Sequence, residues 1–291
     1  ECIQDFHNSL TRQMNDMDIS YHLIFVNDGS SDNTQKKLEE LAEIDSHVKV
    51  IELSRNFGHQ AAITCGMAES QANLVITIDG DGEHPIEKIP EMLAFADKGY
   101  DLVLTQRQEA QSASWFKRVT SNGFYKIIGF LTSTPIVEGV GDYRLMNRTV
   151  IDTLNQMPEF HRFIRGMVAW AGYRSVVVPY IPAKRLGGRS KYSLKKMLRL
   201  AQDAIFSFSL APIIASLIIG IIFLCLAIFI GIISFINPLF ESPISSLLVF
   251  LILFCTGVIV TTSSLIGLYS GMTFQQVKWR PNYIIRSKIN F

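Results

Sequence analysis

Three carboxylates stand at alternating positions in the segment Asp79-Gly80-Asp81-Gly82-Glu83, directly after an apolar stretch. Two aspartates separated by one residue can hold a hard divalent cation, because carboxylate oxygens are ligands that Mg²⁺ and Mn²⁺ prefer. Such a cation can bridge the phosphates of a diphosphate, and the glycines let a ligand approach the backbone closely. The alternative interpretation of the same residues is a solvated turn.

A calcium loop of the EF-hand type is a further alternative for this acidic segment. That loop requires glycine at its sixth position and an acidic residue at its twelfth. Counted from Asp79, these positions hold His84 and Pro90, so the sequence excludes an EF-hand.

The acidic segment lies within a regular alternation of short apolar stretches and helical patterns. Strands are predicted at 21–27, 48–53, 74–78 and 101–105. Helices are predicted at 32–44, 60–70 and 86–98. This alternation predicts an α/β fold with a mainly parallel sheet. Ligands bind beyond the carboxyl ends of the strands in such sheets, and Asp28, Asp79 and Asp81 all follow a strand.

The chain after residue 115 has a more helical pattern. Helices are expected at 149–157 and 160–171, with a late strand at 175–178. Residues 193–208 interleave Lys and Arg with Leu and Met, which predicts an amphipathic helix on a membrane surface.

Two apolar stretches, 206–236 and 244–269, each exceed the roughly 18 residues needed to cross a bilayer. Glu241, in the short connection between them, is the only charged residue from 205 to 271. Two membrane-spanning helices in a hairpin are therefore predicted. Two buried core helices are the alternative, which is disfavoured because helices of soluble proteins usually keep a polar stripe.

Basic residues flank both predicted spans on the side away from Glu241. They are Lys184, Arg185, Arg189, Lys191, Lys195, Lys196 and Arg199 before the first span, and Lys278, Arg280, Arg286 and Lys288 after the second. The positive-inside rule then places both flanks in the cytoplasm, in a multi-pass protein of the plasma or inner membrane. With 27 basic against 26 acidic residues overall, nucleic-acid binding is not expected.

Four motifs together resemble one protein family. They are Asn27-Asp28-Gly29-Ser30-Ser31-Asp32-Asn33-Thr34, Asp79-Gly80-Asp81-Gly82-Glu83-His84-Pro85, Gly141-Asp142-Tyr143-Arg144-Leu145 and Arg185-Leu186-Gly187-Gly188-Arg189-Ser190-Lys191-Tyr192. With the two spans, they resemble the family 2 inverting glycosyltransferases of GT-A (Rossmann-like) fold. Within these, the resemblance is to the polyisoprenyl-phosphate glycosyltransferases, such as dolichol-phosphate mannose synthase and bacterial undecaprenyl-phosphate glucosyltransferases.

The resemblance implies transfer of one sugar from a nucleotide-sugar, a UDP-sugar on the bacterial pattern, to a polyprenyl phosphate. Asp28 then matches the residue that contacts the nucleotide base. Asp79 and Asp81 match the pair that holds the donor and Mg²⁺ or Mn²⁺, with Glu83 as a further metal ligand where relatives usually have Gln.

Other roles carry over from the same motifs. Asp142 and Arg144 match an acceptor-side motif and, with Asp81, are the expected catalytic residues. Arg107 matches a basic residue that faces phosphate, with an exposed surface arginine as the alternative. A segment near the donor diphosphate supplies Arg185, Ser190 and Lys191, whose alternative interpretation is a basic flank of the membrane span.

Four regions are expected along the chain: a catalytic domain at 1–192, an interface helix at 193–209, the hairpin at 210–271 and a cytoplasmic tail at 272–291. The family's first strand is not found at the start of this sequence. The tail alternates basic and apolar residues and could pair between subunits of a homo-oligomer. A non-catalytic scaffold and a lipid-sugar transport component are alternatives to the enzyme. A processive synthase is disfavoured, because the sequence shows neither a Q-x-x-R-W motif nor further spans.

Overall fold

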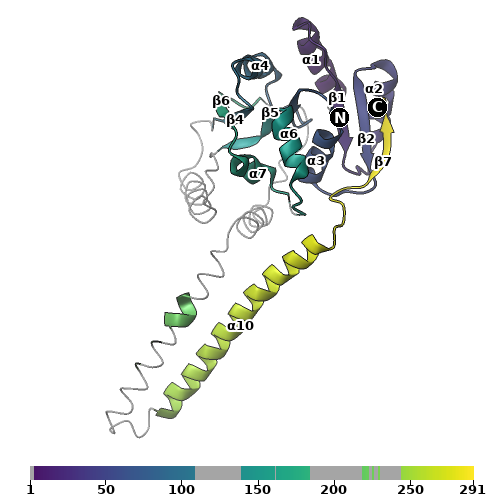
Figure 1. Cartoon of the computed structure of the whole chain (residues 1–291). Helices are drawn as coiled ribbons and strands as arrows, with labels where there is room; N and C mark the ends of the chain where they lie inside the picture. Colours follow the sequence, from purple (N-terminus) through teal and green to yellow (C-terminus); the bar gives the residue numbers. More distant parts are fainter. Residues whose placement is uncertain are drawn as a thin grey trace. The chain divides into compact units, whose positions relative to one another are not determined.

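The computed structural model describes residues 3–108, 139–160, 162–183, 218–222, 225, 229 and 244–291 (Figure 1). The chain divides into two compact units. The first, the globular unit, comprises Glu1–Ala204 and Pro281–Phe291, and the second comprises Ile205–Arg280.

The globular unit contains two sheets. The first has the strand order β1-β2-β7, from Leu23–Asn27, Val48–Leu53 and Ile285–Ile289. The second has the order β3-β5-β4-β6, from Leu74–Thr77, Val140–Asn147, Leu102–Arg107 and Ser175–Tyr180.

The prediction of a mainly parallel sheet is wrong for the described part of the chain. β1 pairs with β2, and β4 with β6, in parallel. The other three pairings, β2 with β7, β3 with β5 and β4 with β5, are antiparallel. The difference comes from β5 and β7, two strands that the pattern of apolar residues did not predict.

The bounds of the helices agree to within a few residues with those predicted from the sequence, apart from one helix that was not predicted. That helix is α1, Ile3–Asp16. The predicted helices appear as α2 Thr34–Ile44, α3 His59–Glu69, η1 Ile86–Lys88 with α4 Ile89–Asp97, α6 Arg148–Gln156 and α7 Ile164–Ala171. α2 begins where the carboxylate of Asp32 accepts the backbone N–H of Thr34, which satisfies a donor at the helix start.

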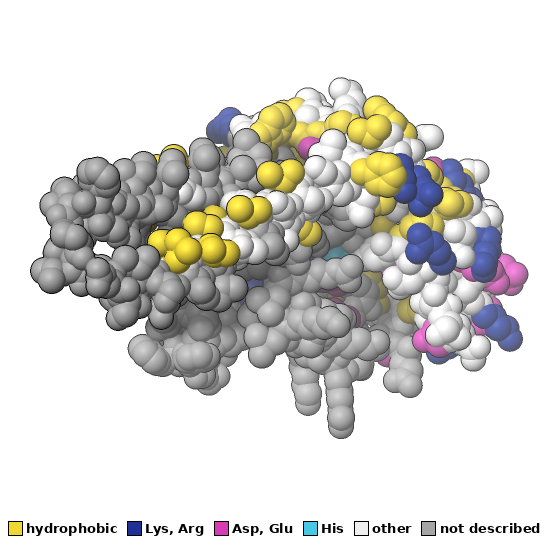
Figure 2. Space-filling view, turned by 90° about the horizontal axis from the view of Figure 1, so that it is seen from below, with side chains coloured by type: hydrophobic (Ala, Val, Ile, Leu, Met, Phe, Trp, Pro, Cys, Tyr) yellow, Lys and Arg dark blue, Asp and Glu magenta, His cyan; other side chains and the backbone are white. Residues whose placement is uncertain are grey.

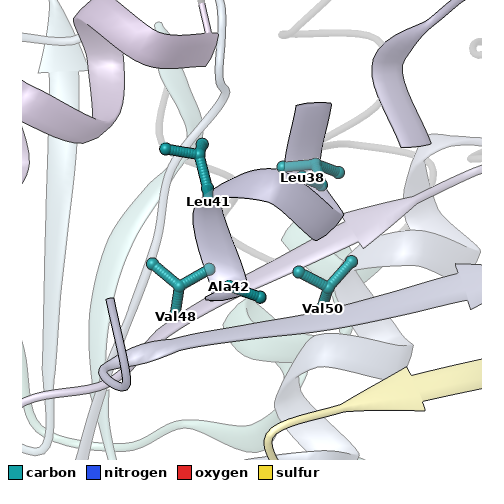
Figure 3. Packing of buried hydrophobic residues seen from close by; sticks show 5 residues of the cluster. All are labelled: Leu38, Leu41, Ala42, Val48 and Val50. Atoms are coloured by element: carbon teal, nitrogen blue, oxygen red, sulfur yellow. The ribbon is translucent and has the colours of Figure 1, made fainter. Parts of the chain in front are cut away.

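The core of the first sheet lies between α2 and β2. Figure 3 shows Leu38, Leu41 and Ala42 of α2 facing Val48 and Val50 of β2, all five buried. Val48 and Val50 face the helix together because alternate residues of a strand share a face. This packing fixes β2, and with it the loop that leads into α3.

The C-terminal strand β7 completes this core. Ile285, Ser287 and Ile289 are half-buried, whereas Arg286 and Lys288 are exposed, so the alternation in the tail is that of a strand with one covered face. β7 pairs with β2 of its own chain, whereas the sequence suggested pairing between subunits. The last residues of the predicted tail therefore belong to the globular unit.

Shortening Ile289 tests the contribution of β7 to stability. Ile289 packs against the cluster of Leu38, Leu41, Ala42, Val48 and Val50. We expect Ile289→Ala to lower the free energy of unfolding by about 1–2 kcal/mol, less than for a fully buried isoleucine. Thermal unfolding in mild detergent measures this against wild type. A melting temperature of Ile289→Ala equal to that of wild type would show that β7 adds no stability through this cluster.

The second unit contains the long helix α10, Ile244–Val277. Within it, Phe254–Val277 is long and apolar enough to cross a membrane, and it is the single such helix among the described residues. Figure 2 shows hydrophobic side chains along this helix. Most of the first predicted span and the whole predicted interface helix lie outside the described residues, so the structure does not test the hairpin.

Candidate active site

Asp28 directly follows β1 and holds the loop that follows β2. Its Oδ1 accepts the backbone N–H of Phe57 at 2.7 Å, and its Oδ2 accepts that of Gly58 at 2.8 Å. The structure thus gives Asp28 a role within the protein, since it joins the two loops that precede α2 and α3. A carboxylate has further acceptor positions, so contact with a nucleotide base stays a prediction.

Gly29 lies where the same two loops meet. Its φ is +65°, and a Cβ atom added to it would lie 2.5 Å from the backbone carbonyl carbon of Arg55. A backbone atom cannot move aside as a flexible side chain can. Glycine at this position therefore lets the loop after β1 lie directly against the loop after β2.

Gly29→Ala is expected to lower thermal stability. A left-handed backbone alone costs about 1–3 kcal/mol for a non-glycine residue, and the clash with Arg55 adds to it. Gly99→Ala is the matched control, because Gly99 also has positive φ (+80°) but meets no backbone atom within 4 Å. Thermal unfolding of both variants measures the effect. Equal losses in both would mean that the close approach at Gly29 is unimportant.

Asp79 lies just after β3, between two histidines. Its Oδ2 lies 3.1 Å from Nε2 of His84, and its Oδ1 lies 3.6 Å from Nε2 of His59. His84 is in turn fixed by Tyr180, whose hydroxyl lies 3.1 Å from Nδ1. Burial would raise the pKa of Asp79, but the hydrogen bond with His84 and the charges of both histidines outweigh it and lower that pKa. Asp79 is therefore an ionised carboxylate, 39% of whose side-chain surface is exposed.

Asp81, Glu83 and Arg107 lie along the loop that follows Asp79. Oδ1 of Asp81 accepts the backbone N–H of Glu83 at 3.0 Å. Arg107, at the end of β4, places Nη1 3.5 Å from Oε2 of Glu83. The backbone carbonyl of Glu83 accepts the N–H of Ala183, the last described residue before 184–217. Arg107 is thus beside the acidic loop, half exposed.

The described carboxylates do not form a ready-made metal site. Within the ranges that the structure describes, no group of three or more His, Cys, Asp and Glu side chains is arranged to hold a metal ion. Asp79, Asp81 and Glu83 therefore do not supply three metal ligands as they stand. A cation held here would need further ligands from a bound molecule or water, as is usual for Mg²⁺.

Asp142 lies on β5 at the centre of a cluster of basic side chains. Its Oδ1 accepts from Nη2 of Arg144 at 2.7 Å and from Nε of Arg165 at 3.2 Å. Its Oδ2 accepts from Nη2 of Arg165 at 2.8 Å and lies 3.3 Å from Nε2 of His59. Only 6% of the Asp142 side chain and 1% of that of Arg144 are exposed.

The alternation of β5 explains how these groups come together. Asp142 and Arg144 share one face of the strand, since they are two residues apart. Tyr143 and Leu145 point to the opposite face and join the apolar cluster that contains Met92 of α4. The face with Asp142 also meets Arg165, which stands in the first turn of α7.

The pKa values in this cluster follow from its charges. Burial would raise the pKa of Asp142, but the hydrogen bond with His59 and the charges of Arg165 and Arg144 hold it far below its ordinary value. Burial lowers the pKa of Arg144 to about 10, which still leaves it charged at neutral pH. The hydrogen bond with Asp142 raises the pKa of His59 against the opposing effect of burial.

The structure brings several predicted residues together and leaves others undescribed. His59 contacts both Asp79 and Asp142, so the acidic loop and the β5 cluster form one site. Asp28 holds a separate pair of loops. Arg185, Ser190 and Lys191 lie outside the described residues.

Three contributors to the site were missed from the sequence. His59 and His84 carried a usable signal, because each stands between a predicted strand and the next predicted helix, at the edge where ligands bind. Arg165 carried no such signal, because a helical pattern does not indicate which strand the start of α7 packs against.

Comparison with known proteins identifies the family of this chain. The sequence model described as "Glycosyl transferase family 2" matches residues 1–154. "Uncharacterized glycosyltransferase YkcC" of Bacillus subtilis (strain 168) is 37% identical over 98% of this chain and 89% of its own length. "SfII prophage-derived bactoprenol glucosyl transferase" of Shigella flexneri is 36% identical over 91% of this chain and 86% of its own length.

The matched residues include Asp28, Asp79, Asp81, Asp142 and Arg144. Similarity to the full-length relatives extends well beyond this region, over nearly the whole chain. With its mixed α/β, GT-A-like domain, the chain is a glycosyltransferase and belongs to glycosyl transferase family 2.

Proposed function

We propose that this chain transfers a single sugar, with inversion, from a UDP-sugar to a polyprenyl phosphate such as undecaprenyl phosphate. The observation that carries the proposal is that Asp79 and the cluster around Asp142 meet at one histidine, His59. The acidic loop, which could bind a metal and a diphosphate, thus lies beside the positive charges of the Asp142 cluster, which could bind a second anion. The similarity to bactoprenol glucosyl transferases supports a lipid acceptor.

Asp79 and Asp81 would hold Mg²⁺ or Mn²⁺ together with the donor diphosphate, with Glu83 beside them. The residues fit such a cation, because their hard carboxylate oxygens stand on a strand-end loop and Asp79 is partly exposed. When bound, the metal neutralises charge that develops on the leaving diphosphate. Arg107, beside Glu83, would add positive charge on the same side.

The acceptor needs little help to become a nucleophile. A phosphate monoester has a second pKa near 6, so at neutral pH it is largely a dianion and can attack the anomeric carbon directly. Asp142 would be a poor base, because its pKa is held low and its oxygens already accept from two arginines. Its proposed role is to orient Arg144 and Arg165, and the enzyme's main task is to position two anions.

The membrane would bring the lipid acceptor to this site. α10 contains the described candidate span, and we propose that it anchors the protein as part of a hairpin over 210–271. The catalytic domain, 1–192, would lie in the cytoplasm, with an interface helix at 193–209. Arg185, Ser190 and Lys191 follow shortly after Ala183, which binds the backbone of Glu83, and this supports their placement near the donor diphosphate.

A panel of radiolabelled UDP- and GDP-sugars tests the reaction and names the donor. Each is incubated with the full chain, undecaprenyl phosphate and Mg²⁺ or Mn²⁺, and organic-extractable label is counted. One UDP-sugar is expected to give a lipid product whose anomeric configuration, determined by NMR, is opposite to that of the donor. Labelling from GDP-sugars alone, or retained configuration, would refute that part of the proposal.

A further inference from the structure

The two carboxylate oxygens of Asp79 have different neighbours. Oδ2 lies 3.1 Å from Nε2 of His84, within hydrogen-bond range, and only 9% of the His84 side chain is exposed. Oδ1 lies 3.6 Å from Nε2 of His59, which is too far for a hydrogen bond, and 52% of the His59 side chain is exposed. Oδ2 is therefore bonded to a buried histidine, whereas Oδ1 makes no hydrogen bond with any residue that the structure describes.

His84 is held on its other side by Tyr180. The hydroxyl of Tyr180 lies 3.1 Å from Nδ1 of His84, and its ring lies edge-on to the imidazole, with the ring centroids 5.7 Å apart. Tyr180 is the last residue of β6, where it pairs with Arg107 of β4, and it is buried. The position of Tyr180 is therefore set by the sheet and not by the acidic loop.

Tyr143 of β5 fixes the same segment of the loop. Its hydroxyl donates to the backbone carbonyl of Pro85 at 3.0 Å, and its ring centroid lies 5.0 Å from that of His84. Tyr143 is itself fully buried. Two adjacent residues of the loop, His84 and Pro85, are thus attached to two strands of the second sheet.

The hydrogen bonds from Tyr180 through His84 to Asp79 form a consistent network. The ionised carboxylate of Asp79 can only accept, so Nε2 of His84 donates to it. In a neutral imidazole, Nδ1 then accepts from the hydroxyl of Tyr180, and in a protonated imidazole it donates to the same oxygen. The network Tyr180–His84–Asp79 therefore persists in either state of the histidine, and it ties the orientation of the carboxylate to the end of β6.

We propose that Tyr180 and His84 are positioning residues that hold Asp79 so that Oδ1 is left for the metal, an inference that rests on the metal role of Asp79 in the proposed function. A hydrogen-bond partner that orients a metal-binding carboxylate raises metal affinity, because less freedom is lost when the metal binds. Oδ2 is already bonded to His84, whereas Oδ1 has no hydrogen bond with a described residue to give up. Tyr180 and His84 act here through Asp79 and need no contact with the substrates.

Tyr180→Phe tests the end of the network that is remote from the metal, because it removes one hydroxyl and keeps the ring. Mn²⁺ is titrated into the full chain in mild detergent and followed by EPR, with the same UDP concentration for every variant. The dissociation constant for Mn²⁺ is expected to rise about 2- to 10-fold, the scale of one lost hydrogen bond. The affinity for UDP in the presence of a chelator should stay within about twofold of wild type, because the network acts on the metal.

Two substitutions of His84 separate orientation from packing. His84→Phe keeps a ring but has no donor for Asp79, and it is expected to weaken Mn²⁺ binding about 10- to 100-fold. In His84→Gln the amide nitrogen can replace Nε2 as the donor, so Mn²⁺ affinity should lie between that of His84→Phe and that of wild type. Equal Mn²⁺ affinity in the two variants would mean that His84 does not act by donating to Asp79, which would overturn its proposed role.

Tyr173→Phe is the matched control. The hydroxyl of Tyr173 hydrogen-bonds with Oγ1 of Thr153 on α6, outside the network that leads to Asp79. Its Mn²⁺ dissociation constant should equal that of wild type, and melting temperatures in metal-free buffer show that each variant is folded. Mn²⁺ affinity of Tyr180→Phe equal to that of wild type, or the same loss in Tyr180→Phe and Tyr173→Phe, would overturn the inference.

Failure of the inference is distinguishable from failure of the proposed function, because Mn²⁺ binding requires no turnover. If wild type binds Mn²⁺ but makes no lipid-linked sugar, the proposed function fails, and the comparison of Mn²⁺ affinities still tests the network. If wild type makes the product and Tyr180→Phe binds Mn²⁺ equally well, the function stands and the inference is wrong. Wild type that binds no Mn²⁺ would overturn both the metal role of Asp79 and the inference.

Discussion

Replacing Asp142 by Asn is expected to lower the free energy of unfolding by about 3–5 kcal/mol, the usual cost of removing one partner from a buried ion pair. The reason is Arg144, which is almost completely buried and whose Nη1 has no hydrogen-bond partner among the described residues. Without the carboxylate, two guanidiniums would face each other with no negative charge between them. Thermal unfolding in mild detergent measures the loss.

Asp152→Asn is the control for that substitution. Asp152 pairs with Arg148 on the surface of α6 and is mostly exposed, so its loss should cost less than about 1 kcal/mol. The same small change in both variants would show that the Asp142 cluster is not what stabilises β5 against α7.

The same carboxylate predicts how stability depends on pH. The pKa of Asp142 is lower in the folded than in the unfolded protein, so its stabilisation is fully present above the unfolded value of about 3.9. As pH falls below that value towards the folded pKa, the stabilisation is lost. Wild type should therefore keep this contribution from neutral pH down to about pH 4 and lose it only in stronger acid.

Replacing Asp79 by Asn is expected to lower kcat about 100- to 1000-fold or more, the scale for removing one electrostatic contact to a developing charge. Asn keeps the shape of the side chain but removes the negative charge that would hold the metal. Because Asp79 is partly exposed and its histidine neighbours can donate to the amide oxygen, the fold should be retained.

Two measurements make this second expectation specific. Wild type is expected to bind UDP more tightly with Mg²⁺ than without it, and the Asp79→Asn variant to bind UDP equally in both conditions. Asp97→Asn, at the exposed end of α4, should behave as wild type in both assays. Turnover of Asp79→Asn within twofold of wild type would remove Asp79 from the proposed metal site.

Local sequence pattern was sufficient to predict the elements that carry Asp28 and the acidic loop. β1, β2 and β3 are short apolar stretches that end in polar turns, and α2 and α3 follow them at regular spacing. The positions of Asp28, Asp79 and Asp81 at strand ends followed directly. The positions of these residues could be predicted from the sequence, because each depends only on the strand that precedes it.

β5 was missed for a physical reason. Asp142 and Arg144 occupy one face of this strand, where a core strand would normally carry apolar residues. Asp142 is buried because Arg144 and Arg165 supply positive charge, and Arg144 is buried because Asp142 supplies negative charge. Such a pair breaks the apolar pattern that predicts strands, and it can be recognised only when α7 has been placed beside the strand.

β7 and Arg165 depend on contacts between residues far apart in the sequence. β7 pairs with β2 across more than two hundred residues, and no local signal tells which strand edge it joins. Arg165 reaches Asp142 because α7 begins against α3. The charge and periodicity of these segments indicate which elements they can form. Which residues they contact is determined only by the tertiary fold.

The most direct test of lipid-phosphate glycosylation is a single extraction assay with the full chain and the radiolabelled UDP-sugar that the donor panel selects. Label is counted in the organic phase with undecaprenyl phosphate present or omitted, and with Mg²⁺ or a chelator. The expected result is extractable label that requires both the lipid phosphate and the metal and is absent with Asp79→Asn. Label that appears equally without lipid phosphate, or release of free sugar in its place, would contradict the assignment of a polyprenyl phosphate as the acceptor.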